Sequence, residues 1–203
     1  MEDQVEQSWE KFLNPQTFRA NLISASLFIT GYEILKDSII QEIKSFYLLG
    51  FDETDPAARG PYEKEVLALD SKRKVFPASI AWLKANDVID SSDEKAIIDL
   101  TDHRNKLAHR LSEFLSESGK DVESARLETL VSLVAKIDRW WIMNFELAIR
   151  NDIDSGKVDP NRISSGRMII LQMLLQTAAA TDSTELYKMF HELQAKQKPP
   201  ATK

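Results

Sequence analysis

The stretch Asp102-His103-Arg104-Asn105-Lys106-Leu107-Ala108-His109-Arg110 gathers side chains that are suited to chemistry on a phosphate group. Arginine presents a fixed fork of N–H donors to phosphate oxygens and keeps its positive charge. Histidine, with an unperturbed pKa of about 6.5, accepts or donates a proton near neutral pH. Asparagine can donate to a phosphate or hold the orientation of a histidine. We therefore take Arg104, Asn105 and His109 as candidate catalytic residues.

These groups suit the cleavage of RNA without a metal ion. In that reaction the 2′-hydroxyl loses a proton, the phosphate gains charge, and the 5′-oxygen leaves in protonated form. On a helix, Asn105 and His109 lie about 40° apart on one face, and the long side chain of Arg104 can reach the same end. One histidine does not easily perform both proton transfers, so we expect a twofold dimer that brings two copies of this helix to one cleft.

The composition of the chain excludes several classes of protein and of chemical site. The chain has 203 residues, 43% of them hydrophobic, a net charge of −6, three histidines and no cysteine. It is long enough for one domain with a buried core and too apolar to be wholly disordered. The absence of cysteine excludes disulfides, thiolate metal sites and cysteine nucleophiles. We expect a soluble, cytoplasmic protein that needs no cofactor and does not span a membrane.

Apolar residues recur at helical spacing between sparse glycines and prolines. A first interval begins at Asn14-Pro15, and one helix is expected over Phe18–Leu49. Its predicted apolar stripe consists of Phe28, Tyr32, Leu35, Ile39, Ile43 and Phe46. We expect a loop over Asp52–Gly60. Further helices are predicted over Tyr62–Leu69, Pro77–Ala85, Asp121–Ile149, Arg167–Ala180 and Leu186–Leu193.

The helix that carries the candidate site has a predicted start signal. Ser91 and Glu94 have the spacing of a capping box, so this helix is expected from about Ser92 through His109, with a possible continuation to Leu115. Arg104 interrupts its apolar seam, and a buried guanidinium needs a partner, a ligand or water. The apolar members of that seam are Ile97, Leu100, Leu107, Leu111 and Phe114. No run of alternating β-branched residues suggests a sheet, so the chain is predicted to be an all-α helical bundle.

The motif Arg104-Asn105-Lys106-Leu107-Ala108-His109 resembles the HEPN superfamily (higher eukaryotes and prokaryotes nucleotide-binding), whose ribonuclease members carry Arg-Asn-x-x-x-His. The likeness covers about Ser71–Leu115, including the helix around Phe76–Leu83 and the turn that contains Val88-Ile89. Spacing alone has little specificity, but the asparagine and the alanine before the histidine make this match much more specific.

The resemblance implies a four- to five-helix bundle of the up-and-down type. The residue pattern adds extra C-terminal helices, within one domain over residues 1–195, and a disordered basic tail over 196–203. It also implies a homodimer through the motif helix and metal-free cleavage of an RNA substrate by an enzyme of toxin or phage-defence type. An antitoxin or other regulatory protein is a further expected partner. Some toxin members carry a modified tyrosine two residues after the histidine, where this chain has Leu111.

Each candidate residue also has a structural interpretation. Arg104 and His109 suit an ion pair and a helix-terminal histidine that complements the helix dipole. Lys106 and Arg110 are candidate RNA-binding residues or members of a solvated basic face. His103 is expected at the surface. Asp99 and Asp102 could pair with Arg104 or with the partner chain of the dimer, but two isolated acids do not make a metal site.

Three other patterns favour structural roles. The run Lys72-Arg73-Lys74 is more typical of a solvated segment before a helix than of a phosphate site. At least one residue of Trp140-Trp141 is expected to face the core, so packing is favoured over stacking on bases. If Asp152 is the first position of a calcium loop, Gly156 falls at position 5 instead of 6 and Ile163 replaces the glutamate of position 12, so a calcium loop is rejected.

The alternative function is a non-catalytic helical module that binds a protein partner, a nucleotide or RNA. Transcriptional repression finds little support because no helix-turn-helix is evident.

Overall fold

The computed structural model describes residues 2–48, 56–117, 122–149, 158–159 and 162–179. The regular elements within these ranges are all helical, without a strand, which confirms the all-α class. The predicted helix Leu186–Leu193, the segment Asp152–Gly156 and the tail 196–203 lie outside them. In chain order the elements are α1 (Glu2–Leu13), α2 (Pro15–Leu48), α3 (Pro56–Glu65), the 3₁₀ turn η1 (Leu67–Leu69), α4 (Val75–Ala85), α5 (Ser91–His109), α6 (Leu111–Ser116), α7 (Ser124–Trp141), the π-helical turn η2 (Ile142–Glu146), α8 (Leu147–Ile149) and α9 (Gly166–Ala179).

The long helix α2 begins where the sequence predicts a break. The side chain of Asn14 accepts hydrogen bonds from the backbone N–H groups of Gln16 and Thr17, so it caps this helix. Pro15 occupies the first turn, where its missing N–H is not needed. The segment before Asn14 also forms a helix, α1, for which the sequence analysis made no prediction.

The apolar stripe of α2 is confirmed over most of its length. Its members Phe28, Tyr32, Leu35, Ile39 and Ile43 are all buried. Phe46 is the exception, because it is 40% exposed at the edge of the core. Its ring still contacts those of Tyr47, Trp141 and Phe145.

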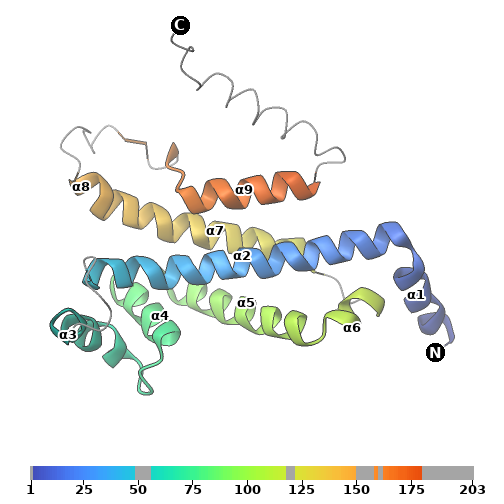
Figure 1. Cartoon of the computed structure of the whole chain (residues 1–203), viewed down its shortest axis with the longest axis horizontal. Helices are drawn as coiled ribbons and strands as arrows, with labels where there is room; N and C mark the ends of the chain where they lie inside the picture. The colour runs from blue at the N-terminus through green and yellow to red at the C-terminus, as the bar shows by residue number, and fades with distance from the viewer. Residues whose placement is uncertain (1, 49–55, 118–121, 150–157, 160–161, 180–203) are drawn as a thin grey trace, which may run out of the picture.

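Helices pack on both sides of α2 (Figure 1). On one side lie α7 and α9, and on the other lie α3, α4 and α5. A Cβ atom at Gly31 would lie 3.1 Å from Cδ2 of Leu130, so the glycine permits a close approach of α2 to α7. α1 contacts α2 and α6 and extends from the end of the bundle (Figure 1).

The end of α7 anchors an aromatic cluster. The rings of Trp82 and Trp141 are stacked, with centroids 5.6 Å apart and an interplanar angle of 4°. Trp140 contacts both of these rings edge-on. The predicted packing role of the tryptophan pair is therefore confirmed, with Trp141 4% exposed. The predicted helix Asp121–Ile149 begins instead at Ser124 and passes through the π-helical turn η2.

The segment before α4 differs from its prediction. The expected loop Asp52–Gly60 is wrong from Pro56 onward, because α3 begins there and includes Gly60 and Pro61. Pro61 is the sixth residue of α3, so it lies inside the helix and removes one hydrogen bond of the i→i−4 pattern. The expected helical piece Tyr62–Leu69 is divided between the end of α3 and η1.

A buried polar cluster connects α2, α7 and α9. Asp138 is 2% exposed and accepts hydrogen bonds from the hydroxyls of Ser38 and Ser165. The guanidinium of Arg167 lies 3.3 Å from the same carboxylate and 2.6 Å from Glu42 of α2. These charge-assisted bonds fix the start of α9 against the bundle.

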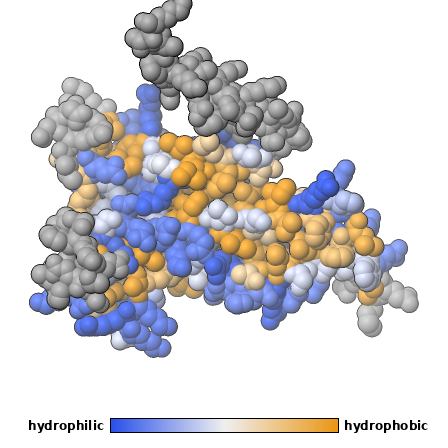
Figure 2. Space-filling view, viewed as in Figure 1, coloured by the Kyte–Doolittle hydropathy of each residue, from blue (hydrophilic) through white to orange (hydrophobic). Residues whose placement is uncertain are grey.

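A broad apolar area is visible on the surface in Figure 2. Exposed apolar side chains occur on α1, notably Trp9 at 58%, and on α9, notably Ile170 at 55% and Met173 at 53%. Within the described ranges, no helix combines the length and hydropathy that crossing a bilayer requires.

Candidate functional site

Four of the five candidate site residues lie on α5, namely Arg104, Asn105, Lys106 and His109. The fifth, Arg110, directly follows the last residue of this helix. The capping box that starts it differs from the predicted one by one residue, because Asp90 is the N-cap and Asp93 the reciprocal partner. The Asp90 carboxylate accepts from Ser92 and from the backbone of Asp93, and these hydrogen bonds hold its pKa well below the ordinary value. Glu94 instead pairs with Lys84 of α4 at 2.5 Å.

Arg104 is held at the junction of α5 and α2. Its Nη2 donates to Oε1 of Glu33 at 2.6 Å, and its guanidinium carbon lies 5.7 Å from the ring centroid of Tyr32. The arginine side chain is 31% exposed, so it lies at the rim of the core. This ion pair confirms the prediction that a guanidinium on the apolar seam requires a partner. The partner is neither Asp99 nor Asp102.

The two predicted acidic partners lie elsewhere on α5. Asp99 forms an ion pair with Arg126 of α7. The exposed carboxylate of Asp102 has no hydrogen-bonding or ionic partner among the described residues. The true partner, Glu33, was missed because the sequence does not reveal which turn of α2 faces α5. The sequence feature that points to Glu33 is its position directly after Tyr32, a member of the buried stripe.

The ring of Tyr32 lies against the guanidinium of Arg104 and is itself held on α5. Its hydroxyl donates to Oγ1 of Thr101 at 3.0 Å, and Thr101 in turn donates to the backbone carbonyl of Ile97. Burial raises the pKa of the Tyr32 phenol, so the hydroxyl keeps its proton and the bond to Thr101 near neutral pH. The ring face that Arg104 covers is thereby fixed against α5.

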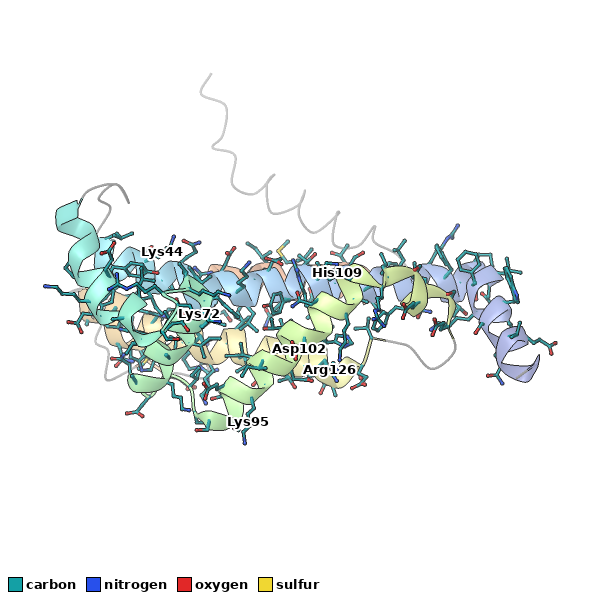
Figure 3. The ribbon with its side chains drawn as sticks, turned by 90° about the horizontal axis from the view of Figure 1, so that it is seen from below. Lys44, Lys72, Lys95, Asp102, His109 and Arg126 are labelled. Carbon is teal, nitrogen blue, oxygen red and sulfur yellow. The ribbon has the colours of Figure 1, made fainter. Side chains whose placement is uncertain are left out.

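Asn105 and His109 lie on the exposed side of the same helix. The Asn105 side-chain carbonyl accepts from Nη1 of Arg104 at 3.4 Å, a long hydrogen bond. His109 is exposed at the C-terminal end of α5, one turn beyond Asn105. Figure 3 shows α5 with Asp102 in its middle and His109 at its end. The structure therefore brings Arg104 and Asn105 into contact and leaves His109 accessible to a ligand.

The helix ends at Arg110, whose backbone angles of φ −132° and ψ 35° separate α5 from α6. The predicted extent of this helix through His109 is therefore confirmed, and its possible continuation to Leu115 is not observed. The guanidinium of Arg110 is exposed and lies 3.8 Å from the Glu113 carboxylate. Lys106 is also exposed, so both candidate RNA-binding cations are accessible to solvent.

His103 is buried, so the prediction that it lies at the surface is wrong. It is 9% exposed, and its ring lies edge-on to Phe28 at 4.7 Å and to Phe114 at 5.7 Å. Burial, followed by the nearby charge of Arg126, lowers the pKa of His103. The burial of His103 could have been predicted from its spacing from Leu100 and Leu107, because steps of three and four residues place position 103 on the same buried face.

The described residues contain no group of three or more histidine, aspartate and glutamate side chains that could hold a metal ion. The polar groups at the site are thus an arginine, an amide and an imidazole on one helix, with a glutamate from α2 behind the arginine. No protein-family model matches this chain, and no curated protein or solved structure matches it either.

Proposed function

We propose that this protein is a metal-independent endoribonuclease of the toxin or phage-defence type, acting as a homodimer that joins two copies of α5. The observation that carries the proposal is the arrangement of Arg104, Asn105 and His109. Arg104 is fixed by Glu33, while the exposed Asn105 and His109 follow it along one helix. The resemblance of this motif to HEPN ribonucleases points to the same reaction.

Arg104 supplies the positive charge that the transition state needs. The bonds to Glu33 and Asn105 use one N–H on each terminal nitrogen, and each of these nitrogens carries a second N–H. These remaining donors suit two oxygens of a phosphate, whose negative charge increases as the nucleophile attacks. Because Glu33 fixes the guanidinium in advance, little reorganisation is needed when the substrate binds.

His109 transfers the protons. A neutral imidazole accepts the proton of the 2′-hydroxyl as the O2′–P bond forms. The imidazolium of the second protomer donates a proton to O5′ as the P–O5′ bond breaks. The products are a 2′,3′-cyclic phosphate and a 5′-hydroxyl, and one cycle needs two imidazoles in opposite protonation states. A twofold axis near the end of α5 would supply both.

The test is incubation of total RNA with the purified protein in a metal chelator. We expect cleavage by the wild type and a loss of at least about a hundredfold in His109→Ala, the lower range for a general acid–base group. Arg104→Ala should lose a similar factor. Lys95→Ala is the matched control, because Lys95 is an exposed cation on the same helix, near its opposite end. Equal cleavage by wild type and His109→Ala would reject the proposal.

A second candidate function is a non-catalytic module that binds a protein partner. The exposed apolar side chains of α1 and α9 favour it, since Trp9, Ile170 and Met173 are each more than half exposed. This alternative predicts no chelator-resistant cleavage and stable binding of a partner that Trp9→Ser abolishes.

A further inference from the structure

A groove lies between α4 and α5, beside the candidate site. It has a volume of about 300 Å³ and is lined mainly by apolar side chains. Phe76, Pro77 and Ile80 line it from α4, and Ile98 and Thr101 line it from α5. Ile98 is 53% exposed, so one wall of the groove presents apolar surface directly to solvent.

Two carboxylates also line this groove, and they differ in their partners. Glu94 is neutralised by Lys84, whose Nζ lies 2.5 Å from its carboxylate. Asp102 has neither an ionic partner nor a hydrogen-bond donor among the described residues. The groove thus combines an apolar surface with one negatively charged acceptor that is available to a ligand. Such a site disfavours a phosphate and favours an apolar group with N–H donors on its edge.

The groove continues the face of α5 that carries two of the candidate catalytic residues, Asn105 and His109. Positions 98, 102, 105 and 109 are spaced by three or four residues, so Ile98, Asp102, Asn105 and His109 follow one exposed stripe of α5. The helical rise places Asp102 about 10 Å along the axis from His109. An RNA strand whose phosphate lies at His109 therefore has a neighbouring base within reach of the groove.

We infer that this groove is a subsite for a guanine base of single-stranded RNA, recognised by the carboxylate of Asp102. Guanine alone among the four bases presents two adjacent N–H donors, N1–H and N2–H, on its Watson–Crick edge. The two oxygens of a carboxylate can accept a pair of parallel hydrogen bonds from these donors. The apolar wall formed by Phe76, Ile80 and Ile98 packs against the base, as side chains do in other single-strand sites. This inference rests on the proposed function, to which it adds the base preference.

The test measures binding separately from cleavage. Fluorescently labelled short oligoribonucleotides of alternating guanosine and uridine are titrated with the full-length His109→Ala protein. Matched strands contain inosine, which lacks the N2 amino group, or adenosine in place of guanosine. We expect the guanosine strand to bind about tenfold more tightly than the inosine strand, as loss of one charge-assisted hydrogen bond predicts.

Two variants, each made in the His109→Ala background, assign the preference to the groove. Asp102→Asn should remove the discrimination between guanosine and inosine while leaving binding of the adenosine strand within about twofold of its original affinity. Glu128→Gln is the matched control, because it changes an exposed carboxylate of α7 to the corresponding amide and should retain the preference. Circular dichroism of each variant establishes that it is folded.

Two results would overturn the inference. Equal affinity for the guanosine, inosine and adenosine strands would show that the groove does not recognise guanine, whether or not the protein cleaves RNA. A change of Ile98→Arg that converts a dimer to a monomer without altering base preference would assign the groove to a protein interface. By contrast, guanine preference in a protein that never cleaves RNA would reject the proposed function and retain the subsite.

Discussion

The guanidinium of Arg104 and the carboxylate of Glu33 lie 2.6 Å apart and join α5 to α2 at the rim of the core. The contact is made between side chains that are 31% and 42% exposed, so solvent screens much of its electrostatic energy. Its main consequence is therefore geometric. It fixes the position of the guanidinium on the Tyr32 ring, beside the exposed amide of Asn105.

Replacement of Glu33 separates positioning from stability. We expect Glu33→Gln to change the free energy of unfolding by no more than about 1 kcal/mol, as for a solvent-exposed ion pair. Cleavage of RNA should fall by about tenfold or more, mainly through the turnover number, because a mobile guanidinium is less well placed for the transition state. Urea denaturation and steady-state kinetics measure the two effects. A large loss of stability with unchanged turnover would instead assign Glu33 a structural role.

The buried imidazole of His103 should make stability depend on pH. Its pKa in the folded state lies below the ordinary value of 6.5, mainly because of burial. The unfolded chain therefore binds the proton more readily, and stability falls as the pH decreases from 6.5 toward the lower pKa of the folded state. Above 6.5 this contribution is fully retained.

The urea midpoint of the wild type and of His103→Leu, measured across this pH range, checks that dependence. We expect His103→Leu to show a weaker decrease on acidification, since the leucine does not titrate. Identical pH profiles for the two proteins would show that other groups cause the acid sensitivity.

Asp138 should be important for the attachment of α9. Asp138→Ala would remove the acceptor of the buried Ser38 hydroxyl and leave the charge of Arg167 with Glu42 alone. We expect a loss of about 3 kcal/mol in the free energy of unfolding. Asp37→Ala, at an exposed position one residue before Ser38, is the control and should cost less than about 0.5 kcal/mol. Equal midpoints for both variants in urea would contradict the importance of the cluster.

Helical periodicity made much of the fold predictable. The stripe of α2 and the packing of Trp141 follow from local spacing, because the same period places side chains on one face of any helix. The break at Arg110 and the π-helical turn η2 were not predictable in this way. Both occur inside stretches that have ordinary helix-forming residues, so they depend on tertiary packing that the local sequence does not encode.

The sequence predicted only those residues of the candidate site that lie on one helix, α5. Arg104, Asn105 and His109 could be identified from their types and spacing, yet positions 103 and 104 both fit the buried face between Leu100 and Leu107. The structure places the imidazole of His103 inside and Arg104 at the rim. Glu33 could not be identified, because the contact joins positions 71 residues apart and requires the packing of α2 on α5.

A mixing experiment tests whether two protomers share one cleft. Wild-type and His109→Ala proteins are combined at constant total concentration and allowed to exchange subunits. If each cleft takes one imidazole from each protomer, heterodimers are inactive and cleavage falls with the square of the wild-type fraction. A linear decrease would show that each protomer carries a complete site and would contradict the shared cleft.

The chemical ends of the RNA fragments test the proposed acid–base reaction most directly. Fragments made by the wild-type protein in chelator are analysed for their termini, with His109→Ala protein as the comparison. We predict 2′,3′-cyclic phosphates and 5′-hydroxyls from the wild type and no such fragments from the variant. Fragments with 3′-hydroxyls and 5′-phosphates, or cyclic-phosphate ends produced equally by His109→Ala, would contradict catalysis by this imidazole.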